Sequence, residues 1–586
     1  MRFITGFPAL LFSVLGSISI VTATTQYHDE SFIPDAVLRV TQQNITQSCL
    51  ASKTNVLING TSPGPELRLL EGQTYWIRVY NDMTANNLTM HWHGLSMAVS
   101  PFSDGTPVAS QWPIPPACFF DYEIHVPIGM AGTYFYHSHV GFQAASAAGP
   151  LIVDDLHVPY HYDDEKIIFI QDTFTKDFQT IEKGLVNTPL VWSGEAAAIL
   201  VNGKGGGSAN GTACNASLSV IDVEPGKTYR LRFIGATALT FASLAIEGHG
   251  SLEVIEADGS YTQKADTSFL QVAAGQRYSV LLHTLPNPTQ STYYIQLESR
   301  DRPTVTRSFA ILNYGPKYKN STPFYPPPKP VVSLPKSTVG FLDYKLYPLQ
   351  PSGDFPSAKE VSRTVTITVH QAVRGMTIWL ENHYPWVDTF PTEPYLVSLY
   401  KNDGVEFPSM ERAAQNGGLD PITRAFPAEI GEVVDIVLLN TGADSGGLDA
   451  HPWHAHGRHY WDLGSGNGTY DAATNEAKWA GKEPATRDTT MLYRYGLTTG
   501  NGTVQGWRAW RLRVTEPGVW MIHCHILQHM IMGMQTVWVM GNETEVLGKV
   551  PRPEVEGYLT YGGDVYGNES HWPTAVHYFD TWAENQ

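Results

Sequence analysis

The stretch Val519-Trp520-Met521-Ile522-His523-Cys524-His525 joins four apolar residues to a His-Cys-His triplet. Side chains two positions apart on a β-strand face the same side, so His523 and His525 point one way and Cys524 points the other. One strand would therefore present imidazoles on one face and a thiol on the reverse face. This pattern predicts a strand that lies between two metal sites.

Three further pairs repeat the His-x-His pattern: His91 with His93, His137 with His139, and His454 with His456. Together with His451 and His529, the four segments hold ten of the 21 histidines. A single pair is more often structural or a chance repeat, but four pairs indicate shared metal binding. The eight paired imidazoles could enclose one cluster only if the first and last parts of the chain meet.

Short runs of strand-forming residues alternate with Gly, Pro and Asn turns, for example at 74–80, 229–234 and 433–439. This pattern predicts an all-β fold of sandwiches or barrels rather than βαβ units. At 586 residues the chain is too long for one core. Boundaries at 154–159 and in the Pro-rich stretch 315–335 divide it into three domains, 24–158, 159–325 and 326–586, the last with a C-terminal tail.

Residues 1–23 have the features of a signal peptide, with Arg2 near the start, an apolar stretch at 12–21 and small residues before position 24. We therefore expect a secreted or cell-wall protein without a membrane anchor. Ten N-x-Ser/Thr sequons fit that compartment and predict N-linked glycans, at Asn44, Asn59, Asn87, Asn210, Asn215, Asn320, Asn467, Asn501, Asn542 and Asn568.

The formal charge of −18 argues against nucleic acid or an anionic membrane as a partner, because both need basic patches. The four cysteines are too few for a disulfide scaffold. Cys49 and Cys214 lie in polar, sequon-bearing segments far apart in sequence, and a disulfide between domains is expected there. Cys118 would then be an unpaired, buried thiol with a structural role.

Cys524 can share a metal site with two histidines and a methionine. His451 lies at the opposite strand parity to His454, and His529 and Met534 follow Cys524 by five and ten residues. Two imidazoles, a thiolate and an axial thioether form the ligand set of a blue, electron-transfer copper. Zinc is the alternative, but structural zinc sites show closely spaced cysteine pairs, which this sequence lacks.

On these motifs the chain resembles the multicopper oxidases of the laccase and ascorbate oxidase type over essentially its whole mature length, most closely the fungal ascorbate-oxidase-like members. The resemblance implies three consecutive cupredoxin-like domains and four copper ions. It assigns His451, Cys524, His529 and axial Met534 to a type 1 copper, His91 and His454 to a type 2 copper, and His93, His137, His525 and His139, His456, His523 to the two type 3 coppers.

The resemblance also implies the chemistry. Electrons from a substrate enter at the type 1 copper, pass from Cys524 to His523 and His525, and reduce O2 to water at the cluster. Asp104 matches the family's acidic position beside the type 2 copper, although a turn-forming Asp-Gly pair would explain it equally well. Cys49 and Cys214 fit the family's bridge between its first and second domains.

Four positions depart from the family pattern. Leu527 replaces an acid that follows His-Cys-His-Ile in several members, so a proton relay must use other groups. The segment Gly457-Arg458-His459 replaces the usual Gly-His, and packing is the favoured explanation. Trp112 stands where a cysteine usually ties the first domain to the tail. Leu239 aligns near the acid that accepts the phenolic proton in laccases, which argues against the standard laccase mechanism.

We expect a copper oxidoreductase that oxidises small aromatic or enediol compounds, with a laccase-like role on phenols, in pigment or secondary-metabolite formation, ahead of ascorbate oxidation. Trp379 lies roughly where ascorbate oxidases have an aromatic at the substrate rim, with a core tryptophan as the alternative. An Fe(II) oxidase comes third, because no acidic pair is securely placed beside the type 1 site. A non-catalytic copper-binding protein is disfavoured, because all ten histidines, Cys524 and Met534 are intact.

Overall fold

The computed structural model describes residues 24–209, 212–317, 323–387, 393–402, 404–550 and 554–579. The predicted signal peptide and the sequons at Asn210 and Asn320 lie outside these residues. Strands make up 40% of the structure and helices 9%, which confirms the predicted all-β class. Within the described ranges, no helix is both long enough and apolar enough to cross a membrane.

The first 130 or so residues of the described chain form two facing sheets, which hold the first two His-x-His pairs. One sheet has the order β3 (Lys53–Ile58), β2 (Ala36–Ile45), β5 (Gln73–Asn81), β7 (Phe119–Val126) and β34 (Tyr566–Gly567). The other has the order β4 (Leu67–Leu70), β9 (Ala148–Asp154), β8 (Gly132–His137) and β6 (His91–His93).

The middle of the chain forms a second pair of sheets. One has the order β11 (Ala198–Val201), β10 (Asp164–Thr173), β15 (Thr228–Gly235), β20 (Arg277–His283), β17 (Leu252–Ala257) and β18 (Ser260–Thr267). The other has the order β13 (Thr212–Cys214), β12 (Gly207–Ala209), β22 (Arg307–Asn313), β21 (Thr292–Ser299), β16 (Ala242–Ile246) and β19 (Leu270–Val272), with β14 (Val220–Asp222) beside β22.

The third pair of sheets carries the remaining metal-site motifs. One sheet has the order β24 (Met376–Glu381), β23 (Arg363–Arg374), β26 (Val433–Thr441), β31 (Val504–Arg513), β28 (Tyr460–Gly466) and β29 (Thr486–Arg487). The other has the order β25 (Ala425–Ala428), β33 (Gln535–Met540), β32 (Gly518–Cys524), β27 (His451–Ala455) and β30 (Thr489–Leu492).

Short helices and one small ribbon complete the fold. The helices are α1 (Phe178–Leu185), α2 (Tyr395–Lys401), α3 (Met410–Ala414), α4 (Ala472–Lys478), α5 (Leu527–Ile531) and α6 (Glu543–Leu547), with 3-10 turns at Pro101–Asp104, Gln143–Ala145 and Glu554–Tyr558. Strand β1 (Thr24–Tyr27) pairs with β35 (Val576–Phe579) near the two ends of the described chain.

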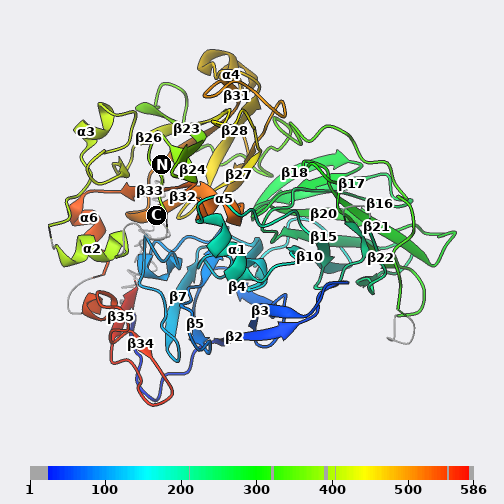
Figure 1. Cartoon of the computed structure of the whole chain (residues 1–586), viewed down its shortest axis with the longest axis horizontal. Helices are drawn as coiled ribbons and strands as arrows, with labels where there is room; N and C mark the ends of the chain where they lie inside the picture. Colours follow the sequence, from blue (N-terminus) through cyan, green and yellow to red (C-terminus); the bar gives the residue numbers. More distant parts are fainter. Residues whose placement is uncertain are drawn as a thin grey trace, which may run out of the picture.

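The first and third sandwiches share one core. A single buried cluster includes Trp92 of the first sandwich and Trp453 and Trp520 of the third. In Figure 1 the first sandwich (blue) lies below the third (yellow to red), and the second (green) extends to one side. The two sandwiches that carry the His-x-His pairs are therefore in direct contact.

The C-terminal tail is attached to the first sandwich without a disulfide. Strand β34 pairs with β7 (Figure 1), and the Trp112 indole N–H donates to the Leu559 carbonyl at 3.2 Å. The Tyr566 hydroxyl donates to the Trp112 carbonyl at 2.5 Å. Trp112, at the position where relatives place a cysteine, thus anchors the tail by hydrogen bonds and packing.

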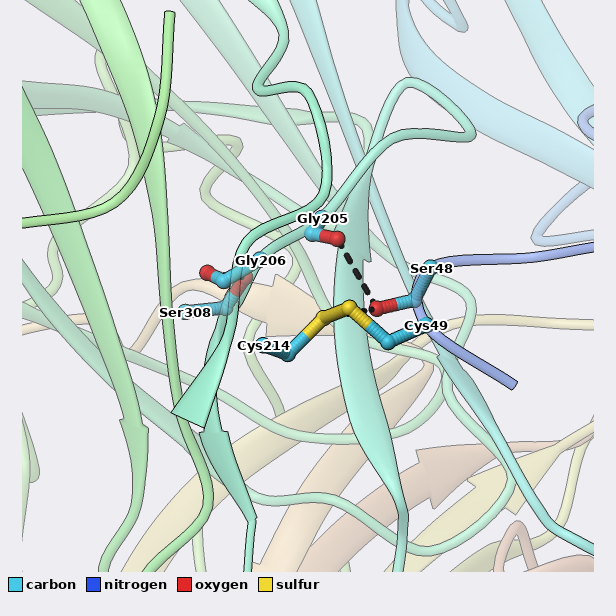
Figure 2. Close-up of a disulfide and its surroundings, with 6 residues drawn as sticks. All are labelled: Ser48, Cys49, Gly205, Gly206, Cys214 and Ser308. Carbon is cyan, nitrogen blue, oxygen red and sulfur yellow. Dashed lines mark hydrogen bonds between the residues drawn. A yellow bond between two sulfur atoms is a disulfide. The ribbon is translucent and has the colours of Figure 1, made fainter. Parts of the chain in front are cut away.

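Cys49 and Cys214 form the expected disulfide between the first and second sandwiches (Figure 2). The adjacent Ser48 hydroxyl donates to the Gly205 carbonyl at 2.9 Å, so a hydrogen bond reinforces the same junction. Cys118 is a free thiol, as expected. It is only half-buried, whereas the sequence predicted a buried side chain.

Removal of this disulfide is expected to lower the stability of the protein. It closes a loop of 165 residues, and cross-links of that kind contribute about 2–5 kcal/mol by restricting the unfolded chain. Cys49→Ser should therefore unfold at a clearly lower temperature in a thermal melt. Cys118→Ser, which removes an unpaired thiol, is the matched control and should melt like the unaltered protein. Equal melting of all three would contradict the prediction.

Candidate metal centres

Cys524, His451 and His529 converge at one site, here called the cysteine site. The Cys524 Sγ lies 3.9 Å from the His451 Nδ1 and 3.7 Å from the His529 Nδ1, and the two nitrogens are 3.1 Å apart. Ligand atoms bonded to one ion at about 2.0–2.3 Å lie roughly 3–4 Å from one another. The three side chains therefore fit a single metal ion.

Local strand geometry builds this site. Strands β27 and β32 pair so that Trp453 lies opposite Cys524, and β27 extends back far enough to include His451. His529 lies on α5, the short helix that directly follows β32. The Met534 N–H donates to the His529 carbonyl at 3.0 Å, and its carbonyl accepts from the Cys524 N–H at 3.1 Å. The ligand atoms of His451, Cys524 and His529 are thus brought together, and the backbone of Met534 lies beside Cys524 and His529.

Thiolate formation at the cysteine site requires a bound cation. Burial raises the pKa of the Cys524 thiol well above its usual value. Burial likewise lowers the pKa of His451 and His529, so both imidazoles are neutral at neutral pH. A thiolate in this apolar surrounding requires a positive partner, which a coordinated soft metal ion supplies.

The eight paired histidines converge at a second site, here called the histidine cluster. Strand β6 pairs with β8 so that His91 lies opposite His137, and β27 pairs with β32 so that His454 lies opposite His523. The two strand pairs belong to the first and third sandwiches, whose contact brings the imidazoles together. The members are His91, His93, His137, His139, His454, His456, His523 and His525, all buried.

The imidazoles of the histidine cluster lie within a few ångströms of one another. The Nε2 atoms of His91 and His454 are 3.4 Å apart. The His523 Nε2 lies 3.0 Å from that of His456 and 3.4 Å from that of His139. The His525 ring centroid lies 4.9 Å from that of His93 and 5.2 Å from that of His137. The cluster thus contains several groups of three ligand atoms close enough together to hold a metal ion, among them those of His139, His456 and His523.

The protonation state of the histidine cluster suits metal binding. Burial, together with neighbouring imidazoles, holds the pKa of five members well below the usual value. Burial also lowers the pKa of His137 to about 4 and that of His523 to about 3. Several ring nitrogens, including the Nε2 of His137 and the Nδ1 of His93, have no hydrogen-bond partner. Neutral, buried imidazoles with free lone pairs are the donors that copper prefers.

Asp104 lies at the histidine cluster. Its Oδ2 is 3.0 Å from the His456 Nδ1, and its backbone carbonyl is 2.7 Å from the His91 Nδ1. Burial raises the pKa of this carboxyl group to about 8. The turn explanation also holds, because Gly105 has a φ of +81° and an added Cβ would lie 2.0 Å from the Met90 carbonyl oxygen. Asp104 therefore both ends a turn and orients two cluster imidazoles.

Asp488 is a second buried carboxylate at the histidine cluster, and sequence reasoning missed it. Its Oδ1 lies 3.2 Å from the His93 Nε2 and 3.5 Å from the His454 Nδ1. Arg277 of the second sandwich binds both carboxylate oxygens at 2.6 Å. Asp488 immediately precedes β30, which pairs with β27, so only that pairing places it beside the histidines. No motif spacing marks it in the sequence.

Trp379 packs directly on the cysteine site. Its ring centroid lies 4.9 Å from that of His451 and 4.8 Å from that of His529. With an exposed fraction of only 4%, it is a buried side chain and does not form an exposed substrate rim. Trp379 is therefore a core tryptophan, which was the alternative prediction from the sequence.

The acid beside the cysteine site is Asp449. Its Oδ2 lies 3.6 Å from the His529 Nε2, and its side chain is 24% exposed. Arg302 binds both Asp449, at 3.2 Å, and Glu195, at 2.8 Å. The sequence analysis placed no acidic pair beside the cysteine site. The structure brings Asp449 and Glu195 together there, from segments more than 250 residues apart. Leu239 is a buried apolar residue.

Asp449 is ionised. Burial alone would raise its pKa, but hydrogen bonding to His529 and the charge of Arg302 hold that pKa well below its usual value. An ionised, partly exposed carboxylate thus lies beside the cysteine site.

Comparison with known proteins gives a consistent picture. Family models described as multicopper oxidase match residues 39–157, 164–317 and 391–544. The chain is 44% identical to laccase-like multicopper oxidase 1 of Thermothelomyces thermophilus, over 96% of this chain and 95% of that protein. It is 32% identical to an L-ascorbate oxidase of Brassica rapa subsp. pekinensis, over 84% and 89%. The structure of Fet3p, a multicopper oxidase that functions in iron import, has a TM-score of 0.70 at 23% identity, over 92% and 96%.

Proposed function

The chain belongs to the multicopper oxidase family and is a copper-dependent oxidoreductase that uses O2; from this premise we propose that it is a laccase-like enzyme that oxidises phenols. Copper, when bound, supplies the one-electron and O2 chemistry. The single observation that carries the choice of substrate is Asp449, a partly exposed carboxylate against the imidazole of His529.

The proposal includes four copper ions, one at the cysteine site and three at the histidine cluster. In this proposal His451, Cys524, His529 and Met534 form the type 1 set, His91 and His454 the type 2 pair, and His93, His137, His525 and His139, His456, His523 the type 3 sets. Distances between atoms or ring centroids support these sets, and backbone contacts support the place of Met534. His523 and His525 flank Cys524 in the chain, so the backbone provides a short electron path between the two sites.

A phenol is the substrate that fits Asp449 best. Its hydroxyl can donate a hydrogen bond to the Asp449 carboxylate while its ring lies near the His529 imidazole. Loss of an electron makes a phenol strongly acidic, so a nearby acceptor for its proton favours oxidation. Laccases carry the proton-accepting acid near the position of Leu239. In this proposal Asp449, from another segment, takes the place of that acid.

Fe(II) and ascorbate fit less well. A hard cation needs free carboxylates, whereas Arg302 binds both Glu195 and Asp449, and Arg494 binds Asp301 at 3.1 Å. Ascorbate oxidation was favoured by an aromatic rim at Trp379, but that side chain is buried.

Secretion and N-glycosylation belong to the same proposal and are supported by the leader-like residues 1–23 and the sequons.

A substrate panel tests the proposal. Purified enzyme with a measured copper content is supplied in turn with a phenol, ascorbate and Fe(II), and O2 uptake is recorded. We expect about four copper ions per chain and the highest kcat/KM with the phenol. Preference for Fe(II) or ascorbate would refute the phenol assignment. About one copper or none, with no O2 uptake, would leave only a copper-binding protein.

Asp449→Asn should slow phenol oxidation while leaving the copper sites intact. A hydrogen bond to a charged group contributes about 1.5–3 kcal/mol, which corresponds to roughly a 10- to 100-fold fall in kcat/KM for phenols. The visible spectrum and copper content should not change. Glu195→Gln is the matched control, because Glu195 shares Arg302 but has no contact with His529 among those described. Equal losses in both variants would assign the effect to Arg302 instead.

A further inference from the structure

A groove of about 770 Å³ lies on the outer surface of the third sandwich. Strand β23 forms its floor: Val365 and Ile367 are buried in the core, whereas Thr366 and Thr368, which alternate with them, line the groove. Ligand sites in proteins commonly measure about 300–1,000 Å³. The groove is therefore large enough to hold a ligand of moderate size.

The wall of this groove is polar and carries little net charge. Besides the two threonines, its described lining includes the side chains of Arg374, His383, Asn416 and Asp444. Hydroxyl, amide and imidazole groups both donate and accept hydrogen bonds, and the charges of Arg374 and Asp444 balance. Sugars are uncharged, and their hydroxyl and acetamido groups also donate and accept. A neutral carbohydrate is therefore the ligand class that the groove fits best.

Asn501, the acceptor of a predicted N-linked glycan, lines the same groove. Its Nδ2, the atom to which such a glycan is attached, donates to the Asp444 Oδ1 at 3.1 Å. Asp444 is held in turn, because its Oδ1 lies 3.0 Å from the His370 Nε2 and its Oδ2 accepts from the Val373 N–H at 2.8 Å. A glycosylated amide keeps one N–H for the contact with Asp444. The glycan therefore starts among the side chains that line the groove.

The backbone around Asn501 fixes this attachment point. The Gly502 N–H donates to the Gly442 carbonyl at 2.9 Å, and the Gly442 N–H donates to the Thr503 carbonyl at 3.2 Å. These bonds tie the turn to the end of β26, whose Thr441 also lines the groove. A ligand tethered at such a point has an effective concentration of about millimolar, so contacts too weak to hold a free sugar suffice to bind it.

We propose that the N-linked glycan of Asn501 folds back into this groove, which is a carbohydrate site occupied by the chain's own glycan. The N-acetylglucosamine residues nearest the protein form hydrogen bonds with the floor threonines and with the polar side chains of the wall. They cover the outward face of β23 and so stabilise the third sandwich. The inference rests on the N-glycosylation proposed above and is independent of the copper sites and of the reductant.

Protection from a glycosidase measures whether the glycan is bound. The full-length, copper-loaded glycoprotein is treated, without denaturant, with an endoglycosidase that cleaves between the two innermost N-acetylglucosamine residues. Mass spectrometry of peptides follows the cleavage at each site. Cleavage at Asn501 should be about tenfold slower than at Asn44, which lies exposed on β2, because one or two hydrogen bonds hold the bound glycan.

Substitutions in the groove should release the glycan. The double substitution Thr366→Val and Thr368→Val deletes two hydroxyls with little change in volume, and Val suits a strand as well as Thr does. It should speed cleavage at Asn501 about tenfold and leave cleavage at Asn44 unchanged. Arg374→Ala, at an exposed position at the end of β23, is a second variant and should change the rate in the same direction.

Loss of the glycan should lower the melting temperature. Thr503→Ala removes the glycan but leaves Asn501 in place, and it should melt about 2–4 °C below the unaltered protein. Thr46→Ala, the matched control, removes the glycan of Asn44 and should melt like the unaltered protein. The double substitution should lower the melting temperature when the glycan is present and have no further effect in Thr503→Ala, because groups in contact are coupled.

Equal cleavage rates at Asn501 and Asn44 would overturn the proposal, and so would a glycan missing from Asn501 alone. An equal effect of the double substitution with and without the glycan would also overturn it, because the threonines would then be purely structural. Absence of glycans from every sequon would refute the N-glycosylation itself, and this inference with it. O2 uptake with a phenol should be the same in all these variants, so the result does not depend on the substrate assignment.

Discussion

Replacement of Cys524 by Ser is expected to abolish both the blue absorption and the oxidase activity, to the background level. The blue band of such sites arises from the bond between thiolate and copper, which a hydroxyl cannot form. Under the proposed function, electrons leave the cysteine site for His523 and His525 through the same residue. Absorption spectra and O2 uptake measure the two losses.

The fold of Cys524→Ser should survive, which makes the result interpretable. Cys524 is fully buried, and Ser is nearly the same size, so the core around it changes little in volume. Circular dichroism and the copper content of the histidine cluster should therefore match those of the unaltered protein. Retention of the blue band or of turnover would show that another residue holds the copper that accepts substrate electrons.

Replacement of His139 by Ala should also lower O2 uptake but should leave the blue absorption in place. His139 is buried in the histidine cluster, with its Nε2 3.4 Å from the His523 Nε2, and it has no part in the cysteine site. Loss of residues that merely support a metal ligand lowers affinity or activity by about 10–100-fold. Loss of a ligand itself should lower O2 uptake by more than about 100-fold.

The blue absorption of His139→Ala should persist, and a phenol should still bleach it in the absence of O2. The variant would thus accept an electron at the cysteine site and fail to pass electrons to O2. Stopped-flow reduction and an O2 electrode separate the two steps. The separate ligand sets of the two sites require that the sites be independent. Loss of the blue band together with O2 uptake would contradict that independence.

Much of this arrangement could be predicted from local sequence because strand geometry is periodic. Side chains alternate between the two faces of strand β32. Cys524 therefore faces away from His523 and His525, whatever the position of the strand in the fold. The same parity placed His451 on the side of Cys524. These predictions needed only the assumption of a strand, and strand-forming residues surround each motif.

Other features depend on contacts between segments that no local pattern connects. Asp488 reaches His93 and His454 through the pairing of β30 with β27 and the contact between sandwiches. Asp449 meets His529, and the Arg302 that holds it comes from the second sandwich. Neither acid lies in a recognisable motif, so the sequence showed only that the acid expected near Leu239 is absent, and it missed both.

By itself, the sequence determined the all-β class, the histidines that share a strand face, and the pairing of Cys49 with Cys214. Tertiary structure alone decided which carboxylates support the two sites, that Trp379 is buried, that Trp112 anchors the tail, and that Asn501 lines a groove. The physical reason is that a strand's period is set by covalent geometry within a few residues. The proximity of distant segments is set by how three cores pack, which depends on the whole chain at once.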